Sequence, residues 1–278
     1  MNSTASARPA DPRLHEWPLV VFTTLAIMGA GLLATPLLAA IVSGTPAVAS
    51  ALMPAGALLL AAGLLVSLAH LGRPARALLA ASALGRSRLS AEAVLGGLTL
   101  LVGGTAALLP YVSPILDLAA ALCAIAFLVS LGLVYGLPGQ LTWRGAVVAM
   151  PLTMGLGFGT VALAGMWDQA TVAVGGVAAA VLAADVALLL FRRLALAWPR
   201  EPFAPRHPAI FANRQWWLAA RLILIDLLPG GLVLAGLPKG AAGALALGIL
   251  VDRLSFYGLA AQATTEAEIG RVEELMGA

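Results

Sequence analysis

The sequence predicts an all-α integral membrane protein with eight transmembrane helices in two four-helix groups. Three observations lead to this fold class. Hydrophobic residues make up 61% of the chain and charged residues only 10%, too few to cover the surface of a soluble domain. Apolar runs long enough to cross a hydrocarbon core of about 30 Å recur eight times. The connections between them alternate between short, nearly uncharged segments and longer, arginine-rich ones.

The eight runs form a single membrane domain over residues 1–278. The first run is too long for a signal-peptide core, so we expect it to be a retained span. Pro151 and Pro229 fall within spans and are expected to kink them, and Pro36 and Pro54 can do the same near membrane ends. The predicted spans are 18–42, 47–69, 91–110, 115–136, 145–166, 171–191, 216–236 and 240–262.

Small residues recur within the spans and indicate close helix packing. Side chains no larger than a hydrogen or a methyl let helix backbones approach in lipid, where dispersion forces hold helices together. We therefore expect the glycines to serve packing. They include Gly29, Gly31, Gly96, Gly97, Gly103, Gly104, Gly155, Gly157, Gly159, Gly175 and Gly176.

Positive charge is distributed unequally between the two sets of connections. Lys239 is the only cation in the four short connections, whereas arginines fill the longer connections and both terminal segments. Because arginines of short loops remain on the cytoplasmic side, both termini and the basic loops are predicted to be cytoplasmic in a bacterial inner membrane. The basic loops could also serve an acidic partner. The predicted docking residues are Arg76, Arg86, Arg88 and Arg206.

Ionisable residues inside spans are costly, so each needs a partner or a purpose. Counting helical rise from the basic side puts Asp185 and Arg221 at matching depth. The same count pairs Asp226 with Arg253. These residues could be structural ion pairs, or a proton relay lining a polar cavity that opens toward the basic face. Asp117, at the other end of its span, is expected to be solvated or to cap a helix.

A polar loop from His70 to Glu92 separates two apolar runs. His70 ends the second span, and Ser90 is a plausible N-cap of the third, which would place Glu92 in the first helical turn. His70 and Glu92 are then expected at shallow depth on the basic side. Each also has a simpler interpretation: Glu92 as a helix-start charge, and His70 as an interfacial histidine hydrated by water.

Metal and haem sites have few candidate ligands in this chain. The single Cys123 cannot supply a cysteine-ligated cluster, and His70 is the only one of three histidines near a span. We therefore expect no haem or iron–sulfur cluster in this chain.

Three motifs carry a resemblance to a known family. His15-Glu16-Trp17-Pro18-Leu19 leads into the first span, and His70-Leu71-Gly72-Arg73-Pro74 and Ser90-Ala91-Glu92 flank the loop before the third. These segments resemble the membrane anchor subunit of dimethyl sulfoxide reductases. The likeness covers nearly the whole chain in length and layout, with the specific motifs in its first third.

The resemblance implies a quinone-reactive, haem-free anchor bound to an iron–sulfur subunit and a molybdopterin catalytic subunit. It places the quinone site on His70 and Glu92, with Arg73 beside them. Arg221 is the candidate for a functional arginine in the second half, although no motif secures it. The quinone would be menaquinone or ubiquinone.

Several functions stay open at this point. The anchor could oxidise quinol for a dimethyl sulfoxide reductase, or reduce quinone with electrons from a cytoplasmic sulfite dehydrogenase, whose anchors are similar. The catalytic centre would in both cases lie in a partner. A secondary transporter with coupling residues in its ion pairs is one alternative, and a purely structural anchor is another.

Overall fold

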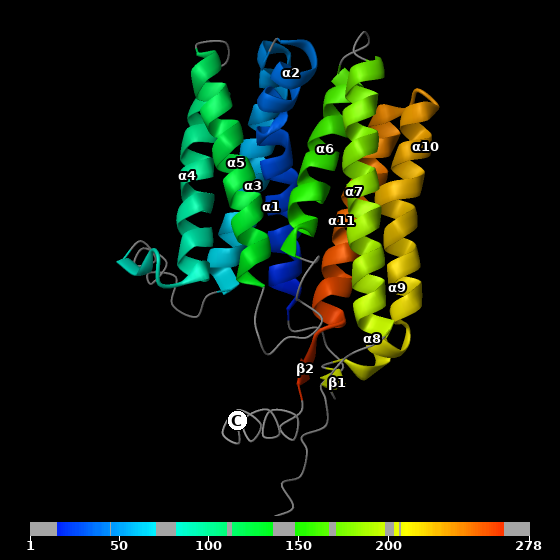
Figure 1. Cartoon of the computed structure of the whole chain (residues 1–278). Helices are drawn as coiled ribbons and strands as arrows, with labels where there is room; N and C mark the ends of the chain where they lie inside the picture. Colours follow the sequence, from blue (N-terminus) through cyan, green and yellow to red (C-terminus); the bar gives the residue numbers. More distant parts are fainter. Residues whose placement is uncertain are drawn as a thin grey trace, which may run out of the picture.

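The fold is almost entirely helical (Figure 1). The computed structural model describes residues 16–44, 46–70, 82–109, 113–135, 148–166, 171–197, 203–205 and 207–263. Two short strands, β1 (Phe203–Pro205) and β2 (Ala261–Ala263), pair antiparallel. The helices are α1 (Trp17–Leu33), α2 (Thr35–Ser43), the 3₁₀ helix η1 (Pro46–Leu52), α3 (Met53–His70), α4 (Arg88–Leu108), α5 (Pro114–Val134), α6 (Met150–Met166), α7 (Thr171–Ala197), α8 (Pro208–Ala212), α9 (Arg214–Arg221), the π-helix η5 (Leu222–Leu227), α10 (Leu228–Leu234) and α11 (Pro238–Gly258).

Seven helical segments within the described residues are long and apolar enough to cross a membrane. They are Trp17–Val42, Ala49–Ala69, Arg88–Leu108, Pro114–Val134, Val174–Leu194, Arg214–Leu234 and Pro238–Gly258. The predicted span 145–166 corresponds to α6, which has 17 residues and is shorter than the others. Its predicted start falls at residues 145–147, outside the described residues. An all-α membrane fold is therefore established, whereas the eighth span stays a prediction.

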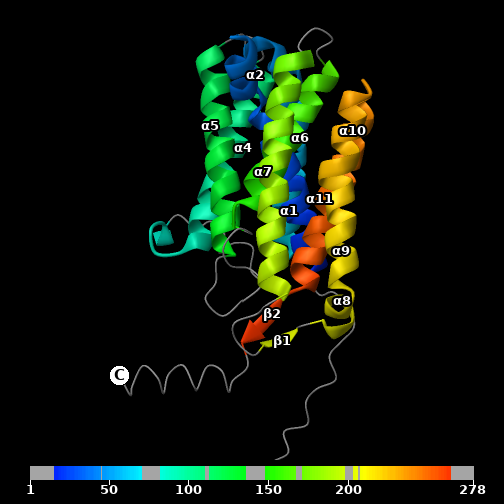
Figure 2. The same ribbon diagram turned by 45° about the vertical axis from the view of Figure 1, so that its right-hand side comes forward.

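The helices form two groups that share α1 as a central contact. One group contains α1, α3, α4 and α5; the other contains α6, α7, α11 and the segment from α9 to α10 (Figures 1 and 2). Helix α1 packs against α3 and α5 on one side and against α6 and α11 on the other. This arrangement matches the two predicted groups and places α1 at their junction.

Close backbone contact joins α1 to α6. A Cβ atom on Gly31 would lie 2.1 Å from the carbonyl oxygen of Gly155, and one on Gly159 would lie 2.3 Å from that of Gly31. No side chain larger than hydrogen fits at these distances, so glycine is required at this helix crossing. A Cβ on Gly97 or Gly176 would instead meet nothing within 4 Å in the described structure. The packing role predicted for the glycines is thus confirmed at the crossing of α1 and α6, but not at every glycine.

A proline divides the first span into α1 and α2. Pro36 lacks an N–H group, so it cannot donate to the carbonyl of Leu32 one turn earlier. The Thr35 hydroxyl donates to that carbonyl instead, at 2.6 Å. The span continues to Val42 across the break at Ala34.

The two prolines that were expected to kink the interior of spans, Pro151 and Pro229, act differently from each other. Pro151 is the second residue of α6, where a missing N–H costs nothing, so the predicted kink there is wrong. Pro229 is the second residue of α10, directly after the π-helix η5, so the span is irregular next to the proline that was predicted to kink it.

The arginines of the described residues gather at one end of the bundle. This end holds the starts of α1 and α4, the ends of α5, α7 and α11, and both strands (Figure 1). Lys239 lies at the start of α11, at the opposite end. The charge asymmetry read from the loops is therefore also an asymmetry of the folded molecule. The arginines concerned are Arg86, Arg88, Arg192, Arg193, Arg214, Arg221 and Arg253.

Candidate functional site

Glu92 is a buried carboxyl without a hydrogen-bond partner on one of its oxygens. The cap of α4 is Ser87, whose hydroxyl accepts from the N–H of Ser90 at 3.4 Å. The prediction that Ser90 caps this helix is wrong, and Glu92 lies in the second turn rather than the first. Its side chain is 4% exposed, and within the described residues Oε1 has no hydrogen-bond partner. A carboxyl in this state is costly, so Glu92 is more than a helix-start charge.

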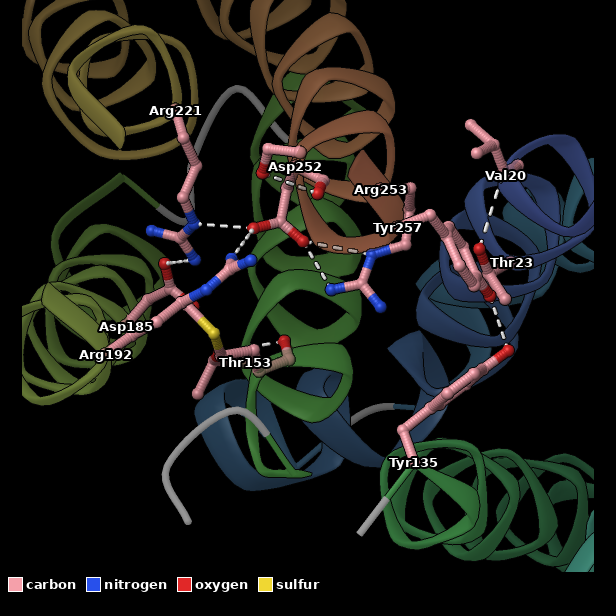
Figure 3. Close-up of polar contacts among 12 residues, drawn as sticks. Val20, Thr23, Tyr135, Thr153, Asp185, Arg192, Arg221, Asp252, Arg253 and Tyr257 are labelled. Atoms are coloured by element: carbon pink, nitrogen blue, oxygen red, sulfur yellow. Dashed lines mark hydrogen bonds and ion pairs between the residues drawn. The ribbon is translucent and has the colours of Figure 1, made fainter. Parts of the chain in front are cut away.

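Two tyrosines outside α4 lie within electrostatic range of Glu92. Tyr135, directly after α5, and Tyr257, on α11, share a hydrogen bond between their hydroxyl groups (Figure 3). Both interact electrostatically with the Glu92 carboxyl. We call Glu92, Tyr135 and Tyr257 the Glu92 site. Because α4 and α5 belong to one helix group and α11 to the other, this site joins the two groups.

The two tyrosines were missed in the sequence. The ring of Phe256 packs edge-on against both tyrosine rings. The distance between ring centroids is 5.0 Å to Tyr135 and 5.1 Å to Tyr257. A signal was available, because two of the three tyrosines of the chain lie at span ends on the basic side. Their contact depends on how α5 and α11 pack, which the sequence pattern does not reveal.

Most of the predicted loop residues cannot be placed. His70 is the last residue of α3, but its side chain is outside the described structure. Arg73, Arg76 and Arg206 also lie outside the described residues. Their roles at a quinone or at a partner therefore stay predictions.

Two predicted docking residues, Arg86 and Arg88, are described and exposed. The Arg88 guanidinium donates to the backbone carbonyl of Leu133 at 3.1 Å, near the end of α5. A cation at that position complements the negative end of the helix dipole. Arg88 thus ties α4 to α5 in addition to any role toward a partner.

A second polar site lies in the other helix group and is centred on Arg221. Its guanidinium donates to Asp185 and, at 2.9 Å, to Asp252 (Figure 3). It also donates to Asp226 at 3.4 Å. The predicted contact between Asp185 and Arg221 is present. Thr153 on α6 adds a hydroxyl donor to Asp185. Because Arg221 is committed to three carboxylates, its predicted role at a quinone is not supported by any described contact.

The predicted pairing of Asp226 with Arg253 is wrong. Arg253 donates through Nε to its neighbour Asp252 at 3.0 Å and lies over the ring of Phe256, with 4.7 Å between Cζ and the ring centroid. Asp226 faces Arg221 instead. Arg253 also acts electrostatically on Tyr135 and Tyr257, so it lies between this second site and the Glu92 site.

The π-helix η5 explains why Asp226 faces Arg221. In an α-helix, residues five apart point about 140° away from each other. A π-helix closes its hydrogen bonds between residues five apart, which brings such residues onto one face. Leu222–Leu227 adopts this form directly after Arg221. The depth count assumed a regular α-helix, and the irregular turn changed the partner of Asp226.

Arg192 completes this site and was not predicted to belong to it. We expected the sixth span to end at residue 191, but α7 continues to Ala197. Arg192 is 2% exposed, and its Nη1 donates to Asp252 at 3.2 Å. We call the whole set the Asp252 cluster: Asp185, Arg192, Arg221, Asp226, Asp252 and Arg253. All six are buried, and their formal charges balance.

Some polar atoms of the Asp252 cluster have no hydrogen-bond partner among the described residues. Among the residues that the structure describes, Nε and Nη2 of Arg192 and Oδ1 of Asp226 have no hydrogen-bond partner. The Asp252 carboxylate, in contrast, accepts hydrogen bonds from three arginines, Arg192, Arg221 and Arg253. The cluster therefore combines firmly paired charges with a carboxyl that can still accept a proton or a donor.

Asp117 also departs from expectation. It is 3% exposed, and Ser50 donates to it at 2.9 Å between Oγ and Oδ2. The prediction of a solvated or capping residue is wrong, because Ser113 caps α5 and Asp117 packs against η1. Asp117 is a buried structural contact at the end opposite the arginines.

Comparison with known proteins identifies the family. A search of curated proteins found no match. The family model described as DMSO reductase anchor subunit (DmsC) matches residues 11–191, more than half of the chain. The match includes Glu92, Tyr135 and Asp185, whereas most of the Asp252 cluster lies beyond it. This chain belongs to the family of DMSO reductase anchor subunits.

Proposed function

We propose that this membrane anchor subunit exchanges electrons between the quinone pool and the iron–sulfur clusters of a partner subunit. Membership of the family makes the chain the multi-pass anchor of a DMSO reductase-type molybdopterin oxidoreductase complex. The quinone proposal rests on Glu92, a buried carboxyl whose Oε1 has no hydrogen-bond partner among the described residues. Such a group is stabilised by a ligand that donates a hydrogen bond to it.

The residues of the Glu92 site fit a quinone. A quinol, when bound, supplies two electrons and two protons, and its two ring hydroxyls donate hydrogen bonds. Glu92 Oε1 can accept from one of them. Tyr135 and Tyr257 offer hydroxyls nearby, and Phe256 adds apolar ring surface. The site therefore combines a proton acceptor with aromatic surface, as a quinone ring requires.

Each residue has a distinct role in this proposal. Glu92 takes the proton from the bound ring hydroxyl, because the described residues supply no ion pair to this carboxyl. The Tyr135–Tyr257 pair holds the ring in position, since its hydroxyls are already fixed by their mutual hydrogen bond. His70, at the end of α3, would hold the second ring oxygen, with Arg73 beside it. Electrons leave toward the partner, which we place on the arginine-rich end.

The direction of electron flow depends on the side of the membrane. The arginine-rich end is proposed to be cytoplasmic, because arginines of short loops are retained there. A cytoplasmic catalytic subunit suits a sulfite dehydrogenase that reduces quinone. An exported one suits a dimethyl sulfoxide reductase that oxidises quinol. Reporter fusions to both termini test the topology, and a periplasmic signal from either terminus would contradict it.

Glu92→Gln tests the quinone proposal. This substitution preserves shape but removes the proton-accepting carboxylate, and general base catalysis contributes about 100- to 10,000-fold. We expect quinone-linked turnover of the assembled complex to fall at least about 100-fold, while electron transfer from an artificial donor directly to the partner is unchanged.

Thr99→Val is the matched control for this experiment. Thr99 lies two turns further along α4, is fully buried, and its hydroxyl oxygen likewise has no partner in the described structure. The control should keep wild-type turnover. Full quinone-linked turnover in the Glu92→Gln complex would instead mean that the chain is a structural anchor and that the partner handles quinone.

A further inference from the structure

Two carboxyl groups of the Asp252 cluster lie side by side around one arginine. Asp185 on α7 accepts from Nη2 of Arg221, and Asp226 on η5 accepts from the adjacent Nη1 at 3.4 Å, so both carboxyls lie against one guanidinium. Both are buried, with Asp185 1% and Asp226 5% exposed. Their closeness follows from the π-helix, which turns Asp226 toward Arg221 and hence toward Asp185.

Two ionised carboxylates cannot hydrogen-bond to each other, because each is only an acceptor. In the described structure, Oδ1 of Asp226 has no donor, and its other oxygen has only the 3.4 Å contact with Arg221. Asp185, by contrast, receives donors from Thr153 and Arg221. A proton on Asp226 would supply the missing donor between the two carboxyls and would relieve the repulsion of two adjacent negative charges.

We propose that Asp185 and Asp226 share one proton and form a proton-binding site in the second helix group, separate from the Glu92 site. The proton resides on Asp226, which has the weaker contact with Arg221, and is donated to Asp185.

The charged groups around Asp226 determine how readily its carboxyl holds this proton. Asp185 acts on it from α7, Arg221 from the end of α9 and Asp252 from α11, while Arg192 and Arg253 are bound to Asp252. Asp252 accepts from all three arginines, whereas Asp226 has only the 3.4 Å contact with Arg221 among the described residues. Asp226 is left with the smallest share of positive charge. It is therefore the carboxyl of the cluster that most readily carries a proton.

Infrared spectroscopy of the purified complex tests this site without any quinone turnover. A protonated carboxyl has a C=O stretch distinct from that of a carboxylate. We expect the wild-type complex to show such a band, shifted by carbon-13 labelling of aspartate and by exchange into heavy water. Asp226→Asn should abolish this aspartate band. Asp117→Asn, which removes a buried aspartate of the other helix group, should leave it unchanged.

The outcomes separate this proposal from the quinone proposal. Glu92→Gln should keep the aspartate band, because the two sites are distinct, even where quinone turnover is lost. Since the labelled wild-type complex carries the band itself, misfolding of a variant cannot hide the result. Absence of an aspartate band across the pH range in which the complex is stable would overturn the shared proton, and water would then fill the gap at Asp226.

Discussion

The Glu92 site and the Asp252 cluster lie toward the same arginine-rich end of the bundle. They differ in whether ion pairs compensate their buried ionisable groups. Glu92 is a buried carboxyl for which the described residues supply no ion pair. The Asp252 cluster holds three arginines against three aspartates, with Asp252 bonded to all three cations. An uncompensated buried group is expensive, whereas a compensated one is tolerated. The difference indicates exchange with a ligand at Glu92 and mainly cohesion in the cluster, with Asp226 as the exception.

The largest effect should come from breaking the centre of the cluster. Asp252→Asn removes the negative charge shared by Arg192, Arg221 and Arg253. Removing one partner of a buried ion pair typically costs about 3–5 kcal/mol. We expect the thermal unfolding midpoint of the purified complex, or the amount of assembled complex, to fall sharply.

A double substitution and a comparison with Glu92→Gln test that prediction further. Asp252 is the acceptor of Arg192, so adding Arg192→Gln to Asp252→Asn should recover part of the lost stability. Glu92→Gln should leave the unfolding midpoint unchanged or raise it, because no ion pair is lost. Equal destabilisation by Asp252→Asn and Glu92→Gln would remove the distinction between the two sites.

The next largest effect concerns the contact that holds the two regions together. In Gly31→Ala the new methyl group would lie 2.1 Å from the Gly155 carbonyl oxygen, so α1 and α6 must separate. Overpacking of this kind costs about 1–3 kcal/mol. We expect a lower unfolding midpoint and reduced quinone turnover, because Glu92 on α4 and Tyr257 on α11 belong to different helix groups.

Gly97→Ala provides the control for the glycine prediction. A methyl group there would meet nothing within 4 Å in the described structure, and alanine favours the helix. Its unfolding midpoint should equal or exceed that of the wild type. If Gly31→Ala behaved in the same way, the close crossing of α1 and α6 would be wrong.

The smallest effect should come from the tyrosine pair. Tyr257→Phe keeps the ring against Phe256 but removes the hydroxyl bonded to Tyr135, worth about 0.5–1.5 kcal/mol. Quinone turnover should fall less than in Glu92→Gln. Because both hydroxyls belong to one hydrogen bond, the Tyr135→Phe/Tyr257→Phe double variant should lose little more than either single variant. Additive losses would show that the tyrosines act independently.

Some contacts of the site could be predicted from depth alone. Asp185 and Arg221 lie at matching depth on regular stretches of helix, and they do meet. The same count failed for Asp226, because the π-helix after Arg221 changes which face the residue occupies. It also missed Arg192, since α7 extends past the predicted end of the span. Rise per residue gives depth, but it does not give the direction in which a side chain points.

The membrane class of the chain, the unequal distribution of arginines and the family motifs can all be read from the sequence alone. These properties can be read locally, because transfer of an apolar segment into lipid and retention of arginine on one side depend on the segment itself. Two sets of contacts are seen only in the tertiary structure. Tyr257 of α11 is hydrogen-bonded to Tyr135, and Asp252 binds three arginines. Those contacts depend on the rotation and crossing of helices far apart in the chain. Side-chain packing at crossings such as Gly31 with Gly155 sets both.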